Sequence, residues 1–406
     1  MSLRLLPVTG LAAVVLSVGS AQAKPVEQLT VMTFHTWDST DEFNDGTAKA
    51  VDAILHSGAD VVALQDADEV ANELALELGW WVYHAGWGAA VISRFPITQG
   101  FLAYPAVGAR IQLSDSPPQD VIVWSVELDS TPYGPYLLQD GAEPRDVVWK
   151  EYLQSDRMYE TREILWFMKH EWGHIYNADN VPVFLMGDFE SPSHLDWTVA
   201  TAARHDGNVV RWPVTQLLEN EGFRDVYREA WPDPLVQPGH TWSPIMKGSE
   251  PQDRIDMVHT MGAGVTVASA EVYTGPPGVT RLYPVHEDNT WPSFHAAVVA
   301  EVELVPGSGL PLPPIDQPSI TVADVLVGED VVVQFENTLG FSDDWVGLFE
   351  VGAADDDYFD YAYTGGGVSG TVTLSSLAFS GTYEARLFID DSYGRMAETT
   401  FEVGSP

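Results

Sequence analysis

The feature that most constrains this chain is an apolar run that ends abruptly at a carboxylate. Residues 182–190 read Pro-Val-Phe-Leu-Met-Gly-Asp-Phe-Glu. A short apolar run that follows a proline and stops at a turn is typical of a strand buried on both faces. In α/β proteins, ligands bind at the edge where such strands end. We therefore expect a buried strand that carries Asp188 to the binding edge of an α/β sheet.

The rest of the first three hundred residues agrees with this interpretation, because apolar strand-like segments alternate there with helical patterns. The strand-like segments span residues 29–34, 58–66, 89–97 and 120–128, and helical patterns begin near residue 45 and cover residues 155–172. This alternation predicts an α/β domain over residues 24–304.

A Pro/Gly-rich segment then divides the chain. Residues 305–318 open with Val-Pro-Gly-Ser-Gly-Leu-Pro-Leu-Pro-Pro, which continues neither a helix nor a strand, and we interpret them as a linker. From residue 319 to residue 406, short strands separated by Gly and Asp turns predict an all-β sandwich. A chain of 406 residues is also too long for one ordinary hydrophobic core.

The N-terminus has the parts of a secretory signal. Arg4 supplies a positive charge, residues 5–18 are mostly apolar, and Ala21-Gln22-Ala23 fits the small-residue cleavage rule. This predicts a signal peptide over residues 1–23 and a secreted or periplasmic mature protein with no membrane span. The chain has no cysteine, so it forms neither disulfides nor thiolate metal sites.

The charge balance is strongly acidic. The chain has 59 Asp and Glu residues against 19 Lys and Arg residues, a formal net charge of −40. We interpret most of these acidic residues as surface residues that keep the protein hydrated in a salty environment. Nucleic-acid binding is disfavoured, because it normally depends on basic patches that release counterions. Small phosphoesters or divalent cations are the expected partners instead.

Several short blocks share their order and spacing with one known family. They are Leu64-Gln65, Ser-Arg-Phe-Pro-Ile at 93–97, Gly-Asp-Phe at 187–189, Arg-Ile-Asp at 254–256 and Ser-Phe-His at 293–295. Over about 270 residues the chain resembles the endonuclease/exonuclease/phosphatase superfamily of metal-dependent phosphoesterases. The resemblance implies a four-layer α/β/β/α sandwich and a secreted bacterial-type member of that superfamily. The last segment contains Asp-Trp-Val-Gly-Leu-Phe at 344–349, Gly-Thr-Tyr-Glu-Ala-Arg-Leu-Phe at 381–388 and Asp-Ser-Tyr at 391–393. With these blocks it resembles immunoglobulin-like accessory domains of secreted hydrolases, which implies a surface or protein partner.

The resemblance assigns roles to four residues that are retained or nearly so. Asp188 is expected to position the attacking water, and Asp256 with His295 is expected to form the orienting pair. Asp66 stands at the family's metal-binding Glu and is one methylene shorter. The cofactor implied is Mg²⁺ or Ca²⁺, because oxygen-rich sites without thiolates suit these cations better than Zn²⁺.

Four other positions depart from the family pattern. His35 and Glu190 stand where the family has Asn, Glu127 replaces a His, and Phe294 replaces an Asp. Two unit charges ~4 Å apart repel by about 4 kcal/mol at an effective dielectric of ~20, so Glu127 and Glu190 would oppose phosphate binding. We therefore expect a catalytically impaired or inactive pseudoenzyme whose carboxylate-rich pocket binds a divalent cation. An active Mg-dependent phosphodiesterase or phosphatase with a modified site, acting on a nucleic acid or a lipid or sugar phosphate, remains the alternative.

A remote alternative comes from residues 170–174, which read His-Glu-Trp-Gly-His. His170, Glu171 and His174 match the helical signature of zinc proteases. Aromatic residues near the motif blocks, including Tyr133, Tyr136 and Trp242, are interpreted mainly as packing residues, with a pocket wall as the alternative.

Overall fold

The computed structural model describes residues 25–67, 70–85, 87–115, 118–248, 250–276, 289–305, 319–336, 338, 344–354, 357–388 and 395–405. The expected signal peptide, and all of the expected linker except Val305, lie outside these described residues.

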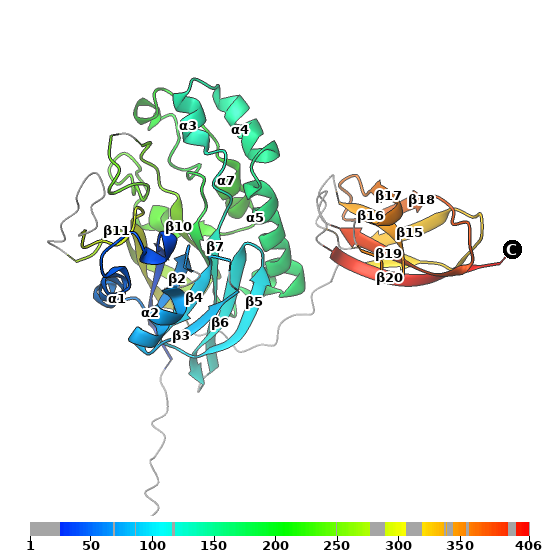
Figure 1. Ribbon diagram of the computed structural model, residues 1–406, viewed down its shortest axis with the longest axis horizontal. Helices are drawn as coiled ribbons and strands as arrows, with labels where there is room; N and C mark the ends of the chain where they lie inside the picture. Colours follow the sequence, from blue (N-terminus) through cyan, green and yellow to red (C-terminus); the bar gives the residue numbers. More distant parts are fainter. Residues whose placement is uncertain are drawn as a thin grey trace, which may run out of the picture.

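The first part of the chain is built on two six-stranded sheets (Figure 1). In order across the first sheet, the strands are β11 (Val265–Tyr273), β12 (Ala297–Leu304), β1 (Gln28–His35), β2 (Val61–Gln65), β4 (Ala90–Ser93) and β3 (Trp81–His84). Across the second they are β5 (Ile97–Ala103), β6 (Ala106–Asp115), β7 (Pro118–Glu127), β8 (Val183–Asp188), β10 (Asp256–Met261) and β9 (Arg224–Asp225). The pairs β1–β2 and β7–β8 are parallel, and the other neighbours are antiparallel.

The central strands are apolar on both faces because each sheet is covered on both sides. Val31 and Ala63 join the core between the two sheets, whereas their chain neighbours Met32 and Val62 join a second core on the outer face of the first sheet. Side chains alternate between the faces of a strand, so one continuously apolar segment fills two cores.

Helices supply the two outer layers. The first sheet is covered by α1 (Gly46–Ser57) and α2 (Val70–Leu78), and the second by α5 (Arg157–Trp166) and α7 (Pro213–Asn220). The remaining helical elements are η1 (Asp38–Thr40), α3 (Gly134–Gln139), α4 (Pro144–Leu153), η2 (Phe167–Glu171), α6 (His174–Asn177), η3 (Ala202–Arg204) and α8 (Val226–Ala230). The expected four-layer α/β/β/α sandwich is confirmed.

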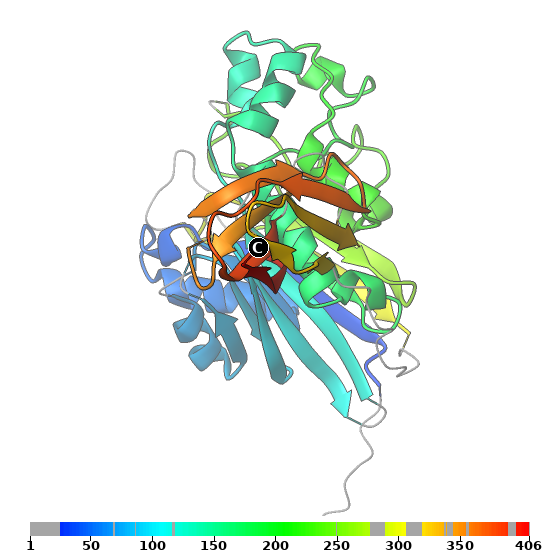
Figure 2. The ribbon, with the colours of Figure 1, turned by 90° about the vertical axis from the view of Figure 1, so that its right-hand side faces the viewer.

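The strand-rich C-terminal part comprises β13 (Ser319–Val322), β14 (Val325–Leu326), β15 (Val331–Glu336), β16 (Trp345–Glu350), β17 (Tyr358–Tyr363), β18 (Ser369–Leu374), β19 (Gly381–Phe388) and β20 (Arg395–Gly404). They form a three-stranded sheet, β13-β15-β18, and a five-stranded sheet, β14-β20-β19-β16-β17 (Figure 2). Buried and exposed residues alternate along β15, as one covered face requires. Trp345 and Phe349 are buried in this part of the chain.

The topology brings the predicted site residues to one edge of the two sheets. Strands β1, β2, β7 and β8 all end there, and the antiparallel β10 and β12 begin there. Asp256 is opposite Asp188 in the β8–β10 ladder, and Glu127 is opposite Asp188 in the β7–β8 ladder. Asp188 ends β8 and Asp256 begins β10, and the two residues meet because these strands run in opposite directions.

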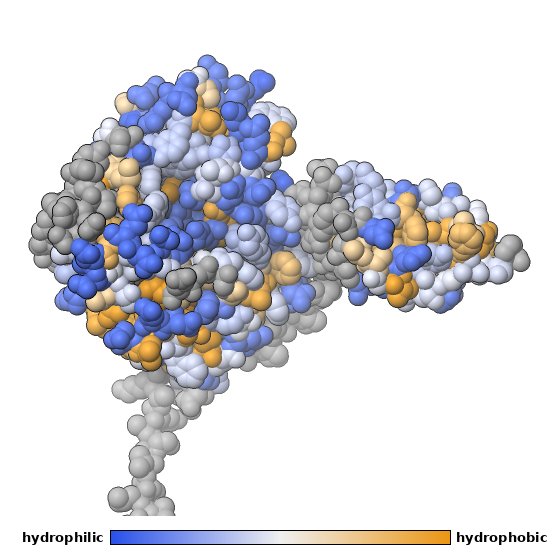
Figure 3. Space-filling view, viewed as in Figure 1, coloured by the Kyte–Doolittle hydropathy of each residue, from blue (hydrophilic) through white to orange (hydrophobic). Residues whose placement is uncertain are grey.

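The surface of the face shown in Figure 3 is predominantly hydrophilic over the region of α3 and α4. In the part of the chain that the structure describes, no helix has the length and apolar character needed to cross a membrane.

Candidate active site

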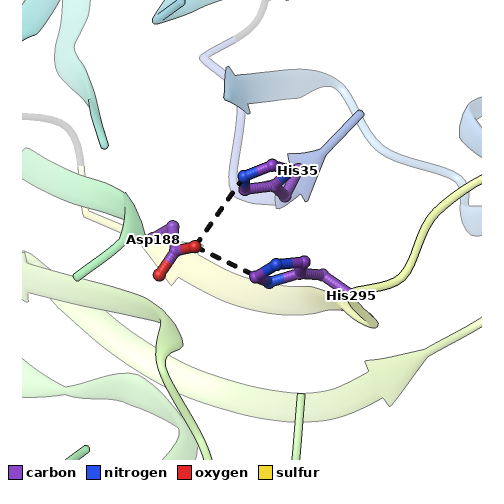
Figure 4. A group of neighbouring side chains, drawn as sticks. All are labelled: His35, Asp188 and His295. Carbon is purple, nitrogen blue, oxygen red and sulfur yellow. Dashed lines mark ion pairs between the residues drawn. The ribbon is translucent and has the colours of Figure 1, made fainter. Parts of the chain in front are cut away.

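Three side chains form the buried centre of the site: His35, Asp188 and His295 (Figure 4). Asp188 Oδ2 lies 3.8 Å from His35 Nε2 and 3.6 Å from His295 Nδ1. The two imidazole rings stack with their centroids 4.2 Å apart and an angle of 6° between their planes. His35 ends β1, Asp188 ends β8 and His295 precedes β12, so the centre joins the two sheets.

Asp256 orients one of these imidazoles. Its Oδ2 lies 3.0 Å from His295 Nδ1, and both residues are buried. A hydrogen bond from Nδ1–H to the carboxylate fixes the ring and leaves Nε2 as a proton acceptor. The expected orienting pair of Asp256 and His295 is therefore in contact.

Burial controls the protonation of this centre. It lowers the pKa of His35, which the neighbouring His295 lowers further. Burial, followed by repulsion from Asp256, raises the pKa of Asp188. Burial also raises the pKa of Asp256 to about 7. Desolvation disfavours the charged form of each group, so the closely spaced carboxylates do not all remain ionised together near neutral pH.

Asp66 and Glu127 reach the same edge, but backbone donors already occupy them. The backbone N–H of Asp38 donates to Asp66 Oδ2, and the backbone N–H of Asp66 donates to Glu127 Oε2 at 2.7 Å. Glu127 Oε1 lies 3.8 Å from His35 Nε2. Asp66 does not belong to the group of metal-type donors formed by His35, Asp188 and His295. In this structure Asp66 holds the turn after β1.

Glu190 projects from a strained position directly after β8. Its φ of 48° is in the left-handed region that Glu rarely adopts, and its N–H donates to Asp188 Oδ1 at 2.8 Å. Burial, followed by repulsion from Asp188, raises the pKa of the Glu190 carboxyl well above its usual range. Phe294 offers no polar atom and packs against Trp37 with a centroid distance of 4.5 Å.

A cavity of about 260 Å³ opens beside the centre. Its lining residues are Trp37, Ser130, Thr131, Tyr133, Tyr136, Glu190, Trp242, Ile255 and His295. Tyr133, Tyr136 and Trp242 therefore form the pocket wall that the sequence left as an alternative to packing. Trp37 was not singled out in the sequence, because its position depends on the unusual turn that follows β1.

The zinc-protease interpretation is wrong for a geometric reason. A π-helical segment, η2, carries His170, and Gly173 with a φ of 67° ends it before α6 begins at His174. His170 packs on Trp166 with a centroid distance of 5.8 Å, while His174 Nδ1 accepts a hydrogen bond from Trp124 Nε1 at 3.2 Å. The two imidazoles are therefore not on one turn of a regular α-helix, as that zinc site requires.

Comparison with known proteins identifies the family. Residues 39–293 match the Endonuclease/Exonuclease/phosphatase family. The chain belongs to the endonuclease/exonuclease/phosphatase family. It is 33% identical over 296 residues to an uncharacterized protein of Caenorhabditis elegans, an alignment that covers 68% of this chain and 92% of that protein.

Solved structures of family members are also similar to this chain. An endonuclease/exonuclease/phosphatase from Beutenbergia cavernae is 14% identical, with a TM-score of 0.44 over 93% of this chain and 100% of that one. A family protein from Bacteroides thetaiotaomicron is 14% identical, with a TM-score of 0.45 over 70% of this chain and 100% of that one.

Members of this family commonly depend on metals, and the buried centre could hold one. One donor atom from each of His35, Asp188 and His295 lies within 4.8 Å of the others. Within the described part of the chain, the buried atoms Asp188 Oδ2 and Asp256 Oδ1 have no hydrogen-bond partner, as expected for oxygens that await a cation or a proton. The chemical types of these donor atoms fit a divalent cation, but binding would change the protonation of one imidazole. His35 Nδ1 accepts the Trp37 N–H at 3.1 Å, so ligation through Nε2 requires the ring to change tautomer.

Proposed function

We propose that this protein is an endonuclease/exonuclease/phosphatase family member with impaired phosphoester hydrolysis, whose buried centre binds a divalent cation. The observation that carries the proposal is the sign of the charges at the site. Glu190 is the acidic side chain in the described cavity lining, which also includes His295. The described lining contains neither Lys nor Arg. Glu127, Asp188 and Asp256 add further carboxylates behind it.

Electrostatics explains why this arrangement opposes the ancestral substrate. A phosphoryl group needs positive or neutral donors around its oxygens. A carboxylate ~4 Å from a unit negative charge opposes its binding by about 4 kcal/mol at an effective dielectric of ~20. Because Glu190 lines the cavity itself, its ionised form would repel a phosphate directly. Its raised pKa means that this repulsion grows as the pH rises.

A cation would be held by Asp188 together with the imidazoles of His35 and His295. When bound, it would offset the charge of the clustered carboxylates and of any phosphoryl oxygen nearby. The carboxylates favour Mg²⁺ or Ca²⁺, and the two ring nitrogens add donors that suit transition metals. Both kinds of cation therefore belong in the test.

Active hydrolysis by a modified site is the second candidate, and the intact pair of His295 and Asp256 favours it. The hydrogen bond of 3.0 Å holds His295 with Nε2 free to accept a proton, as a general base must. In this alternative the protein is an active metal-dependent phosphodiesterase or phosphatase.

We also propose that the protein is exported, and the support is the signal-like N-terminal sequence. Mass spectrometry of the protein secreted by a host that processes secretory signal peptides should find a mature N-terminus near Lys24. Retention of residues 1–23 would contradict export with cleavage.

Calorimetric titration of chelator-treated protein with Mg²⁺, Ca²⁺, Mn²⁺ and Zn²⁺ tests the cation site. We expect saturable binding of at least one cation, and we expect Asp188→Ala to abolish it. Asp233→Ala, which removes an exposed carboxylate, is the matched control and should bind normally. No binding by folded wild-type protein, or equal binding by Asp188→Ala, would overturn the proposal.

A panel of phosphodiesters and phosphomonoesters with the same cations tests the impaired activity. Turnover close to that of efficient enzymes, about 10 s⁻¹, that is lost in Asp188→Ala would establish the active alternative. Turnover that is absent, or slow and lost in His295→Ala, agrees with the proposal.

A further inference from the structure

Aromatic rings dominate the wall of the cavity beside the centre. Trp37 and Trp242 stack with their centroids 5.8 Å apart, and Tyr133 and Tyr136 meet edge to face at 5.0 Å. These four residues come from three separate stretches of the chain, and all of them line the same space of about 260 Å³. That volume is room for roughly eight water molecules at about 30 Å³ each. The cavity is thus large enough for a small organic molecule.

The position of Trp37 is maintained against backbone strain. Trp37, Asp38, Ser39 and Thr40 have φ values of 54°, 47°, 52° and 70°. Left-handed conformations are unfavourable for such residues, above all for the β-branched Thr40. Asp66 holds this turn, because its carbonyl oxygen accepts the Ser39 N–H at 3.0 Å. Strain of this kind persists where the surroundings enforce it, and it is concentrated at ligand sites.

An acidic side chain, and no basic one, accompanies the rings in the described cavity lining. Glu190 also has a left-handed φ, of 48°, and it lines the cavity with the aromatic residues. Outside the lining, Glu250 accepts a hydrogen bond from the Tyr136 hydroxyl. In the described lining there is no Lys or Arg to attract an anion.

We propose that this cavity binds a small organic cation of the quaternary-ammonium class. The negative faces of indole and phenol rings attract such an ion, and Trp is the most effective of these rings. Glu190 places carboxyl oxygens in the same space, and a cation can approach them without a hydrogen-bond donor of its own. The inference goes beyond the proposed function, because it concerns the ligand of the aromatic cavity and not the metal centre or phosphoester chemistry.

Other small ligands fit the same space less well. A phosphate or carboxylate group would find no Lys or Arg in the described lining. A neutral apolar molecule would contact the rings but would leave the Glu190 carboxyl group without a partner. A primary ammonium ion would lose more hydration than a quaternary one and would find few acceptors among the rings.

Titration calorimetry with choline and with 3,3-dimethylbutan-1-ol, its uncharged isostere, tests the inference on chelator-treated wild-type protein. The two probes have nearly the same shape, so the comparison isolates the charge. We expect choline to bind at least about tenfold more tightly. Equal affinity for the two probes would overturn the proposal, and so would the absence of choline binding by folded protein. Because the protein is metal-free, failure here is independent of the result of the cation titration.

Variants locate the binding within the cavity. Trp37→Leu and Glu190→Gln should each weaken choline binding about tenfold or more. Trp149→Leu is the matched control, because Trp149 is 56% exposed and does not line the cavity, and it should bind choline normally. Circular dichroism verifies that each variant is folded. Normal choline binding by folded Trp37→Leu and Glu190→Gln would place the ligand elsewhere and refute the inference.

Discussion

Glu190→Asn is the most informative single substitution in this protein, because it tests the backbone and the charge of the site together. Glu190 has a φ of 48° and lines the cavity next to Asp188. Asn adopts left-handed conformations more readily than Glu, because its short amide forms local hydrogen bonds. It also removes a carboxylate from a place where burial and Asp188 already oppose ionisation.

The expected magnitude has two parts. A left-handed conformation costs an ordinary L-residue about 1–2 kcal/mol, so relief by Asn should raise the free energy of unfolding by about 1 kcal/mol. In a unit of this size that corresponds to an increase in Tm of about 2–4 °C. The second part is affinity for inorganic phosphate. At a pH high enough to ionise Glu190 against its raised pKa, repulsion of about 4 kcal/mol between charges ~4 Å apart leaves ample scope for a tenfold gain, which needs only about 1.4 kcal/mol.

Urea unfolding followed by tryptophan fluorescence measures the first part, and calorimetric titration with phosphate measures the second. Asp206→Asn is the matched control, because Asp206 has a φ of 52° on the exposed surface, away from the cavity lining. It should share the gain from the backbone and leave phosphate affinity unchanged. Stability equal to or below that of the wild type, together with unchanged phosphate affinity, would refute the reasoning.

Three further predictions concern the scaffold. Arg254 is buried, and its Nη2 lies 2.7 Å from Asp225 Oδ2. Arg254→Met should therefore lower the free energy of unfolding, measured in urea, by about 3–5 kcal/mol. A loss below about 1 kcal/mol would contradict this. Burial lowers the pKa of His259 from 6.5 to about 4. Between pH 6.5 and about 4 the folded state therefore binds fewer protons than the unfolded state. The free energy of unfolding should thus fall by roughly 3 kcal/mol as the pH decreases through this range. His259→Phe should remove this part of the pH dependence of unfolding, and an unchanged slope would count against it. Gly187 has a φ of 151° and a Cβ there would lie 1.9 Å from a carbonyl oxygen of β7, so Gly187→Ala should destabilise by about 3 kcal/mol or more. Gly141→Ala, with a φ of 90° and open space around it, should cost much less in the same unfolding assay.

The sequence by itself determined the architecture. The mainly apolar strands around Val31 and Val183 favour burial on both faces, and that requirement produces stacked sheets with helices outside. The resemblance to the family implied that Asp188, Asp256 and His295 belong to one site, and the structure brings them to one sheet edge. These features depend on local patterns that a single chain displays directly.

Only the tertiary structure decided what the polar residues do. Asp66 has the sequence position of a metal ligand, but the backbone of the turn after β1 uses its carboxylate. The sequence pattern at residues 170–174 suggested zinc, yet a π-helical segment and Gly173 separate the two imidazoles. Trp37 became part of the cavity wall through four left-handed residues that no propensity predicts. Hydrogen-bond competition, helix irregularity and backbone strain each depend on contacts between distant segments, and for this reason they could not be derived from the order of the residues.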